Sequence, residues 1–182
     1  MQILKVPDIH VQGLELRNLK REDAGQWYAY LQNPEVVLHT SWNLHSIDDL
    51  LPQFDGFESD AVNSGIKLAI IDTANQQLAG TIGFHTISHI NRSAEISYDL
   101  APAYWGRRIA QAAAQVLCEW GFSKFDLNRI QATALESNVN SCKVLERLGF
   151  EREGYLRAFR MVRGKPGNFW MYSLLHPHLA GK

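Results

Sequence analysis

Residues 104–114 read Tyr-Trp-Gly-Arg-Arg-Ile-Ala-Gln-Ala-Ala-Ala, a turn with one glycine and two arginines that leads directly into a helix-forming segment. The preceding residues 93–100 alternate in polarity and predict a strand. The first amides of a helix have no partner within the helix, and its dipole favours negative charge there. A strand, turn and helix start in this order therefore predict an anion site, to which Arg107 and Arg108 add positive charge. A solvent-exposed turn that carries two arginines is the alternative interpretation.

The rest of the chain predicts a mixed α/β fold. Strands are predicted at residues 13–19, 66–72, 78–87, 93–100, 129–136, 152–162 and 168–175, and helices at 20–33, 46–64, 109–123 and 138–150. Short connections make the strands between 66 and 100 an antiparallel meander, and the helix at 109–123 places the two strands that flank it parallel. We therefore expect one domain over residues 1–182, with a mostly antiparallel sheet flanked by helices.

Composition narrows the classes of function. The chain has 182 residues, enough for one compact core, and its formal net charge of −1 argues against direct nucleic-acid or membrane binding. Cys118 and Cys142 form no CxxC motif, and so few cysteines favour a reducing compartment. The first twenty residues lack the apolar stretch of a signal peptide, and no run reaches membrane-spanning length. We expect a cytoplasmic protein.

The segment at residues 94–113 resembles the acyl-CoA-binding segment of the GNAT acetyltransferases. In that family an R/Q-x-x-G-x-G/A turn binds the pyrophosphate of acetyl-CoA. Trp105 stands in the R/Q place, Arg108 in the place of the first glycine and Ala110 in the last place. If the position of Arg108 needs a positive φ, an arginine there costs about 1 kcal/mol or more and the turn must reshape. We expect binding to survive with altered geometry.

Residues 136–157 resemble the second half of the same family, where an asparagine opens a helix that ends in Leu-Gly-Phe. With residues 91–100 they look most like the RimJ/RimL branch, which acetylates α-amino groups of ribosomal proteins. The resemblance implies a GNAT-like fold with a splayed parallel strand pair, and acetyl transfer from acetyl-CoA, as co-substrate, to a primary amine. A protein N-terminus is the first expected acceptor, and a free polyamine, amino acid or antibiotic is the second. A non-catalytic acyl-CoA-binding domain is the alternative of another class, and a homodimer would fit the resemblance.

The resemblance also implies which residues bind acetyl-CoA. The strand edge pairs with pantetheine, the turn and helix start hold the pyrophosphate, and Asn138 either caps its helix or also bonds to pantetheine. The expected set is Tyr98, Asp99, Leu100, Trp105, Gly106, Arg107, Arg108, Ile109, Ala110, Gln111, Asn138 and Ser141. Many GNAT enzymes carry a tyrosine seven residues after this asparagine as the acid that protonates the thiolate. Leu145 stands there and cannot donate a proton.

Acetylation of an amine needs a proton acceptor for the amine and a proton for the leaving thiolate. Ser141 is the remaining donor near the helix start, unless its hydroxyl simply bonds to the helix backbone. Glu95 is the first candidate base, with a solvated position on the sheet face as the alternative. His85 titrates near neutral pH and is the other candidate. A glutamate from the strand after Leu-Gly-Phe serves some relatives, but that neighbourhood here contains Arg160.

The loop at residues 39–46, His-Thr-Ser-Trp-Asn-Leu-His-Ser, is the candidate acceptor-binding segment. Trp42 and His45 are its predicted substrate-binding residues, and a loop held by one buried aromatic side chain is the alternative. His39 and His45 are six residues apart with no third ligand nearby, so no metal site is predicted.

Overall fold

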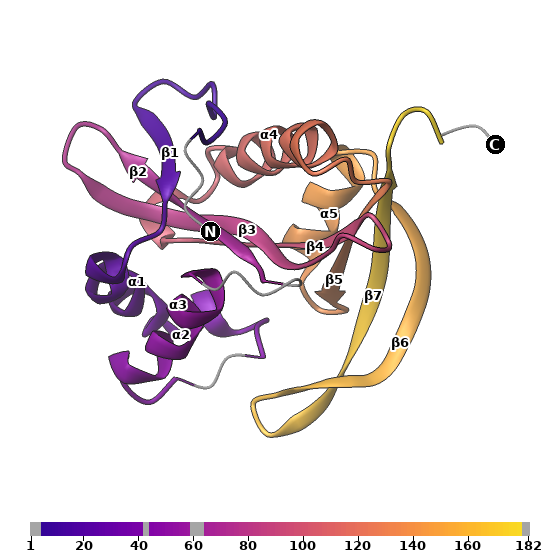
Figure 1. Ribbon diagram of the computed structural model, residues 1–182. Coiled ribbons are helices and arrows are strands. Elements are labelled where there is room, and N and C mark those ends of the chain that lie inside the picture. Colours follow the sequence, from indigo (N-terminus) through magenta and orange to yellow (C-terminus); the bar gives the residue numbers. More distant parts are fainter. Residues whose placement is uncertain (1–4, 42–43, 59–63, 180–182) are drawn as a thin grey trace.

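The computed structural model describes residues 5–41, 44–58 and 64–179, and its centre is a seven-stranded sheet in the order β1-β2-β3-β4-β5-β7-β6 (Figure 1). The strands are β1 (Leu14–Asn18), β2 (Ile66–Asp72), β3 (Gln77–Ser88), β4 (Ser93–Leu100), β5 (Arg129–Leu135), β6 (Glu151–Val162) and β7 (Lys165–Leu175). The helices are α1 (Ala24–Leu31), α2 (Pro34–Val37), α3 (Leu51–Glu58), α4 (Ile109–Lys124) and α5 (Val139–Arg147), with short 3-10 turns η1 (Arg21–Asp23), η2 (Ile47–Leu50) and η3 (Pro102–Tyr104). β4 and β5 pair in parallel and the other neighbours antiparallel. The predicted fold class is confirmed.

Helices cover both faces of this sheet (Figure 1). α4 and α5 cover one face, where a cluster of buried residues such as Phe84 and Ile130 forms the larger core. A Cβ atom at Gly121 in α4 would lie 2.6 Å from the Phe84 ring, so the glycine lets the helix approach the sheet closely. α1 and α3 cover the other face, and their core around Trp27 takes its strand residues from β2 and β3. On this face a cavity opens over β4 and β5 and passes between them to the other face.

The first helical region is divided more finely than the sequence predicts. One helix over 20–33 is expected, whereas α1 ends at Leu31 and α2 begins at Pro34. Asn33 caps α2 by accepting a hydrogen bond from the Glu35 amide at 2.9 Å. Proline fits the first turn of a helix because that position needs no amide donor, so Pro34 starts a helix here.

The C-terminal hairpin turns more tightly than expected. The sequence predicts a connection over residues 163–168, but Val162 pairs with Lys165 and the turn consists of Arg163 and Gly164 alone. Both turn residues have positive φ, +52° and +75°, as two-residue hairpin turns of the primed type require. The long β6–β7 ribbon therefore reaches down past the sheet toward α2 (Figure 1), where Arg163 donates a hydrogen bond to the Val37 carbonyl.

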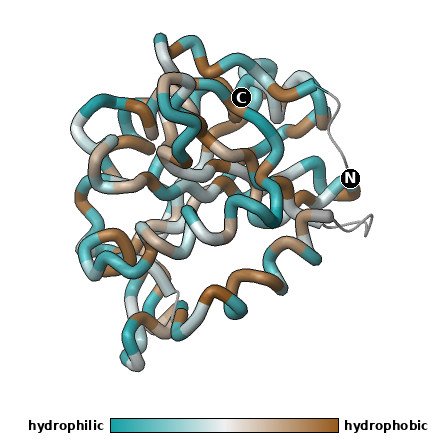
Figure 2. Tube along the Cα trace, turned by 90° about the vertical axis from the view of Figure 1, so that its left-hand side faces the viewer, coloured by the Kyte–Doolittle hydropathy of each residue, from teal (hydrophilic) through white to brown (hydrophobic). Residues whose placement is uncertain are grey.

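Hydrophobic and hydrophilic residues alternate along the trace, as Figure 2 shows for one side of the molecule. Such alternation gives each strand and helix a buried side and an exposed side. In the described part of the chain, none of the helices has the length and apolar character needed to cross a membrane.

Candidate active site

β4 and β5 pair only at one end, which opens a gap in the middle of the sheet. The pairing joins Ser93–Glu95 to Arg129–Gln131, and both strands continue beyond it. The Ala101 amide, at the end of β4, donates to the Ala79 carbonyl of β3 at 2.9 Å. Because successive residues of a strand direct their backbone groups to opposite edges, those of Tyr98 and Leu100 face the gap. The predicted splayed pair is thus present, with backbone donors and acceptors along its edge.

The turn after β4 is fastened to the end of that strand. The Trp105 indole nitrogen donates to the Leu100 carbonyl at 2.8 Å, although the side chain remains 41% exposed. Gly106 has a φ of +75°, and a side chain there would meet open space. The Arg107 guanidinium lies 5.4 Å from the centre of the Tyr104 ring, a cation–π distance. These contacts set the path of the chain into α4.

Arg108 immediately precedes α4 and adopts a left-handed backbone conformation, with φ +59° and ψ +16°. Its carbonyl accepts the first helical hydrogen bond, from the Ala112 amide at 3.1 Å. The amides of residues 109–111 therefore point out of the helix start. The φ of Arg108 is thus positive, and an arginine in this conformation costs on the order of 1 kcal/mol relative to glycine. The backbone keeps a conformation that favours glycine, and the steric cost arises from the Cβ atom of the arginine.

A cavity of about 550 Å³ runs through the gap and joins the two faces of the sheet. On the α5 side its walls include Tyr98, Asn138, Ser141 and Leu145. On the opposite side, which opens beside α3, the lining residues with polar or aromatic side chains are His39, Thr40, Ser41, Asp49, Gln53, Phe57, Lys67, His85, Glu95, Ser97, Asp99, Thr133, Arg160 and Phe169. Two substrates can thus approach the gap from opposite faces.

On the α5 side the structure brings two hydroxyl groups together. Asn138 accepts a hydrogen bond from the Ser141 amide at 3.1 Å and so caps α5. The Ser141 hydroxyl lies 2.9 Å from the Tyr98 hydroxyl, within hydrogen-bond distance. Burial raises the pKa of Tyr98 to about 12, so its phenol stays protonated at neutral pH. Leu145 is buried beside them. The sequence predicted that the backbone of Tyr98 contacts acetyl-CoA, but it did not predict the contact between the Tyr98 and Ser141 hydroxyl groups.

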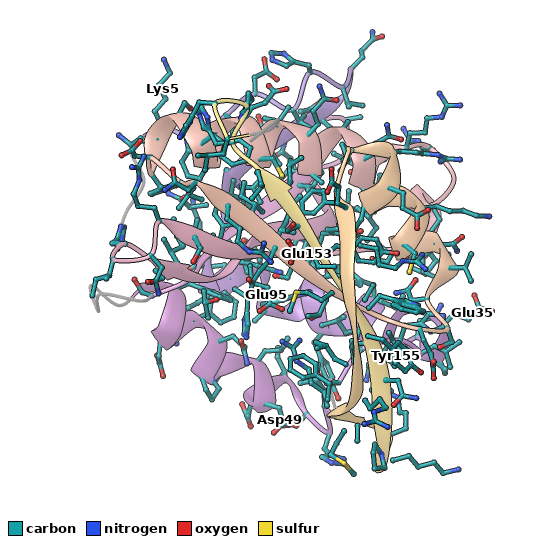
Figure 3. All side chains as sticks on the ribbon, turned by 90° about the vertical axis from the view of Figure 1, so that its right-hand side faces the viewer. Lys5, Glu35, Asp49, Glu95, Glu153 and Tyr155 are labelled. Carbon is teal, nitrogen blue, oxygen red and sulfur yellow. The ribbon has the colours of Figure 1, made fainter. Side chains whose placement is uncertain are left out.

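On the other side, Glu95 is a partly buried and paired carboxylate. Its side chain is 13% exposed, and its Oε1 accepts from Thr133 Oγ1 and from Arg160 Nη2, each at 3.0 Å. Figure 3 shows Glu95 toward the middle of the molecule, above Asp49 on the helical layer. A solvated position on the sheet face is therefore not what the structure shows. Arg160, which stands near the glutamate position of some relatives, supplies the counter-charge.

His85 is the extra residue of a β-bulge in β3. Phe84 pairs with Ile96 and Thr86 with Glu95, so His85 has no opposite residue and its side chain is turned toward the cavity wall that it lines. Burial lowers the pKa of His85, and Arg160 lowers it further, whereas Glu95 raises it. The imidazole is therefore neutral at pH 7 and has a lone pair for a proton.

A group of buried polar side chains beneath the cavity was not predicted. Asp99 accepts hydrogen bonds from the Tyr30 hydroxyl and, at 2.7 Å, from the Thr81 hydroxyl. Its side chain thus faces α1, and strand alternation directs its backbone toward β3, away from the gap. Lys67 donates to Ser97 Oγ at 3.0 Å and lies 3.9 Å from Asp99. The available signal was a lysine inside the apolar run Ile-Lys-Leu-Ala-Ile-Ile of β2.

Of the described residues in the loop at residues 39–46, which was predicted to bind the acceptor, only some line the cavity. Trp42 lies outside the described residues. His45 is exposed and outside the cavity lining; its amide donates to Asp49 at 2.6 Å. His39 lines the cavity instead, with its Nδ1 3.3 Å from the Ser137 hydroxyl. Within residues 5–41, 44–58 and 64–179, no group of three or more His, Cys, Asp or Glu side chains could hold a metal ion.

Comparison with known families identifies this architecture. A family model described as "Acetyltransferase (GNAT) domain" matches residues 13–151, which include the turn, α4, the gap and α5. The chain is a GNAT acetyltransferase. The family resemblance predicted from residues 94–113 and 136–157 is confirmed, and so is an acyltransferase activity class.

Three similar proteins place this GNAT acetyltransferase among its relatives. It is 30% identical over 168 residues to the "Putative ribosomal N-acetyltransferase YdaF" of Bacillus subtilis, covering 92% of this chain and 86% of that one. Two solved structures share the fold. The ribosomal-protein-S5-alanine acetyltransferase of Vibrio fischeri is 21% identical, with a TM-score of 0.82, and the match covers 95% of this chain and 98% of that one. The spermidine N-acetyltransferase of Vibrio cholerae, solved with CoA and spermine, is 22% identical, with a TM-score of 0.78 and coverage of 91% and 96%.

Proposed function

We propose that the protein transfers the acetyl group of acetyl-CoA to the N-terminal α-amino group of a protein. GNAT acetyltransferases use acetyl-CoA, and the solved relative from Vibrio cholerae contains CoA. The observation that carries the choice of acceptor is that two of the three carboxylates lining the described part of the cavity, Glu95 and Asp99, lie next to cations. The similarity to YdaF supports the same choice.

The gap and turn fit CoA chemically. The outward amides of residues 109–111 and the cations Arg107 and Arg108 suit a diphosphate, because a helix start combines free donors with a favourable dipole. The backbone groups of Tyr98 and Leu100 suit the amides of pantetheine. A thioester that follows this edge ends in the cavity beside Ser141. Asp99 is left out of this CoA site because its side chain and backbone face elsewhere.

The reaction then needs two proton transfers. The amine nitrogen attacks the thioester carbonyl carbon, and backbone amides that face the gap stabilise the negative oxygen. As the carbon–sulfur bond breaks, the Ser141 hydroxyl donates a proton to the thiolate and regains one from the Tyr98 hydroxyl, which in turn regains its proton from water. The neutral His85 accepts the proton that the amine loses, directly or through water. Glu95, held by Arg160 and Thr133, orients the incoming amine.

The charges of the cavity favour an acceptor with a single amine. Glu95 is paired with Arg160 at 3.0 Å, and Asp99 faces Lys67 at 3.9 Å. Asp49, the remaining carboxylate among the described lining residues, accepts the amides of His45 and Ser46. A polyamine carries several positive charges and needs free carboxylates to balance them. Because cations already occupy this face, a peptide N-terminus suits it better.

A panel of acceptors tests the proposal by release of free thiol from acetyl-CoA and by mass spectrometry of the product. The panel contains peptides with a free N-terminal alanine or serine, the same peptides with a blocked N-terminus and an internal lysine, spermidine, and free amino acids. We expect acetylation only of the peptides with a free N-terminus, at the α-amino group. A preference for spermidine or free amino acids would make the enzyme a small-amine acetyltransferase. Binding of CoA by calorimetry without turnover on any amine would favour a non-catalytic domain.

A further inference from the structure

Lys67 lies on the floor of the acceptor side of the cavity with its ammonium group buried. The pairing of β2, β3 and β4 places Lys67 opposite Gly83 and Gly83 opposite Ser97, so these residues form one row across three strands. Since Gly83 has no side chain, the lysine crosses β3 and reaches Ser97 Oγ, 3.0 Å from its Nζ. Its side chain is 5% exposed, and the residue lines the cavity.

The ammonium has more donors than the described residues fill. An ammonium carries three N–H donors, and Ser97 accepts one of them. Asp99 Oδ2 lies 3.9 Å away, too far for a hydrogen bond, and already accepts from Thr81 at 2.7 Å. A buried cation with unfilled donors is costly unless a water or ligand oxygen completes its shell. The cavity is where that oxygen can lie.

The position of Lys67 relative to Glu95 matches the size of one amino-acyl unit. Glu95 and Ser97 are two residues apart on β4 and face the same side, which separates them by roughly 7 Å along the strand. If the amine is held at Glu95 and His85, the carbonyl group bonded to the same α-carbon points its oxygen toward Lys67 and Ser97, within hydrogen-bond distance. The neighbouring charges that face Lys67 are Asp99 from its own sheet and, farther along, Glu95 with Arg160.

We propose that Lys67 and Ser97 form a subsite that binds the carbonyl oxygen of the acceptor residue whose α-amino group is acetylated. The enzyme would then recognise an α-aminoacyl group, not simply a primary amine. This inference rests on the proposed function and sharpens it. A peptide N-terminus and an amino-acid amide both satisfy the subsite, whereas an alkylamine of the same shape does not.

The test compares leucinamide with isopentylamine, which has the same side chain and amine but lacks the carbonyl group. An α-amino group has a pKa of about 8 and an alkylamine one of about 10, so kcat/KM is calculated on the concentration of neutral amine. With the wild-type enzyme we expect this value for leucinamide to exceed that for isopentylamine by roughly tenfold to hundredfold, the range for a hydrogen bond to a charged group. In Lys67→Met the ratio should fall to within about threefold of one. Ser97→Ala keeps the ammonium and should give an intermediate ratio. Equal use of the two amines by the wild-type enzyme would overturn the subsite.

Two measurements keep the outcomes distinct. Thermal melting and CoA calorimetry on each variant show whether it is folded, because Lys67→Met leaves Asp99 without its cation. If Lys67→Met does not fold, the wild-type ratio and Ser97→Ala still decide the matter. A ratio that stays high in a folded Lys67→Met variant overturns the inference and leaves N-terminal acetylation standing. Turnover of leucinamide but of no peptide would overturn the proposed function and leave the subsite standing.

Discussion

The two sides of the β4–β5 gap are built in opposite ways. The α4 side, which α5 shares, is made by two local stretches, residues 93–112 and 138–145, and offers mainly backbone groups. The acceptor side is made of side chains from α3 and from every strand from β2 to β7, and contacts such as Lys67–Ser97 and Glu95–Arg160 span 30 and 65 positions in the chain. A site made of local backbone conserves its geometry when side chains change, whereas a site made of distant side chains can change its chemistry one residue at a time.

The use of charge differs in the same way. Arg107 and Arg108 lie exposed on the turn, where solvent and an anionic ligand can both reach them. On the acceptor face three carboxylates are partly buried and lie next to cations: Glu95 with Arg160, Asp99 with Lys67, and Glu153 with Arg129. Charge on the turn can attract a ligand, and charge on the acceptor face selects one. Substitutions on the turn should therefore change the affinity for the anionic ligand, and substitutions on the acceptor face should change which amine is used.

The largest effect is expected at the point where the two sides meet. Ser141→Ala removes the proposed proton donor to the thiolate, so kcat should fall about 100-fold, within the range for loss of a general acid. Asn138 caps α5 through the Ser141 backbone amide, which alanine retains, so Kd for CoA should change by less than about threefold. Initial rates of thiol release and calorimetry measure the two quantities. Equal losses in both would make Ser141 a structural residue.

Tyr98→Phe is the matched variant for Ser141→Ala. It removes the partner hydroxyl 2.9 Å from Ser141 and keeps the ring partly buried against the core. If Tyr98 resupplies the proton, kcat should fall by about tenfold, and the double variant should lose little more than Ser141→Ala alone, because the two residues act as a unit. Fully additive losses would contradict a shared proton path.

A smaller effect is expected on the acceptor side. Glu95→Gln keeps an oxygen for the Thr133 hydroxyl but loses the charge, so kcat/KM with a peptide should fall about tenfold. Because Glu95 raises the pKa of His85, the same change should lower that pKa, and an NMR titration of His85 measures it. Arg160 lowers the pKa of His85, so Arg160→Met should move it upward. A His85 titration that moves the same way in both variants would contradict this arrangement.

Most of the α4 side could be predicted from sequence, because its signals are local. The strand at 93–100, the turn with Gly106, the start of α4 and the Asn138 cap each depend on residues within one or two turns of chain. The exception is the conformation of Arg108. Its side chain gives no sign of a positive φ, and only the family resemblance suggested one.

The acceptor side could not be predicted as well, because its contacts depend on register. Arg160 reaches Glu95 because β6 is irregular: Leu156 pairs with Phe169 and Arg160 with Gly167, two positions farther along β7 than regular pairing would place it. His85 likewise depends on a bulge. Alternation in the sequence predicts which side of a regular strand a residue faces, but it does not reveal extra residues in one strand of a pair.

Arg108→Gly tests the strain on the α4 side. Glycine adopts a positive φ without the steric cost of a Cβ atom, so the variant should gain about 1 kcal/mol, or roughly 2–4 °C in Tm. Arg108→Ala is the control, because it removes the same charge and retains the strain. Both variants should lose a few-fold in CoA affinity if the guanidinium contacts the diphosphate. Equal Tm values for the two variants would show that the turn relaxes around arginine without cost.

The smallest effect is expected at an ion pair on the acceptor face that lies outside the cavity. Glu153 bonds to Arg129 through two oxygens at 2.7 and 2.6 Å, and with the Ser173 hydroxyl this lowers the pKa of Glu153 from 4.5 to about 2. The pKa is depressed on folding, so the stabilisation is present above pH 4.5 and is lost as the pH falls toward 2. Because Glu153 is 42% exposed, solvent screening limits it to about 1 kcal/mol.

Glu153→Gln should therefore lower Tm by roughly 2–4 °C at pH 7, and the difference from wild type should shrink as the pH falls from 4.5 toward 2. Glu151→Gln is the control, since that exposed glutamate lies on the same strand two positions earlier. The acetylation rate at pH 7 should not change in either variant, in contrast to Glu95→Gln. A loss of acetylation rate in Glu153→Gln would mean that an ion pair outside the cavity also influences acceptor binding. The choice of acceptor would then depend on more than the residues that line the cavity.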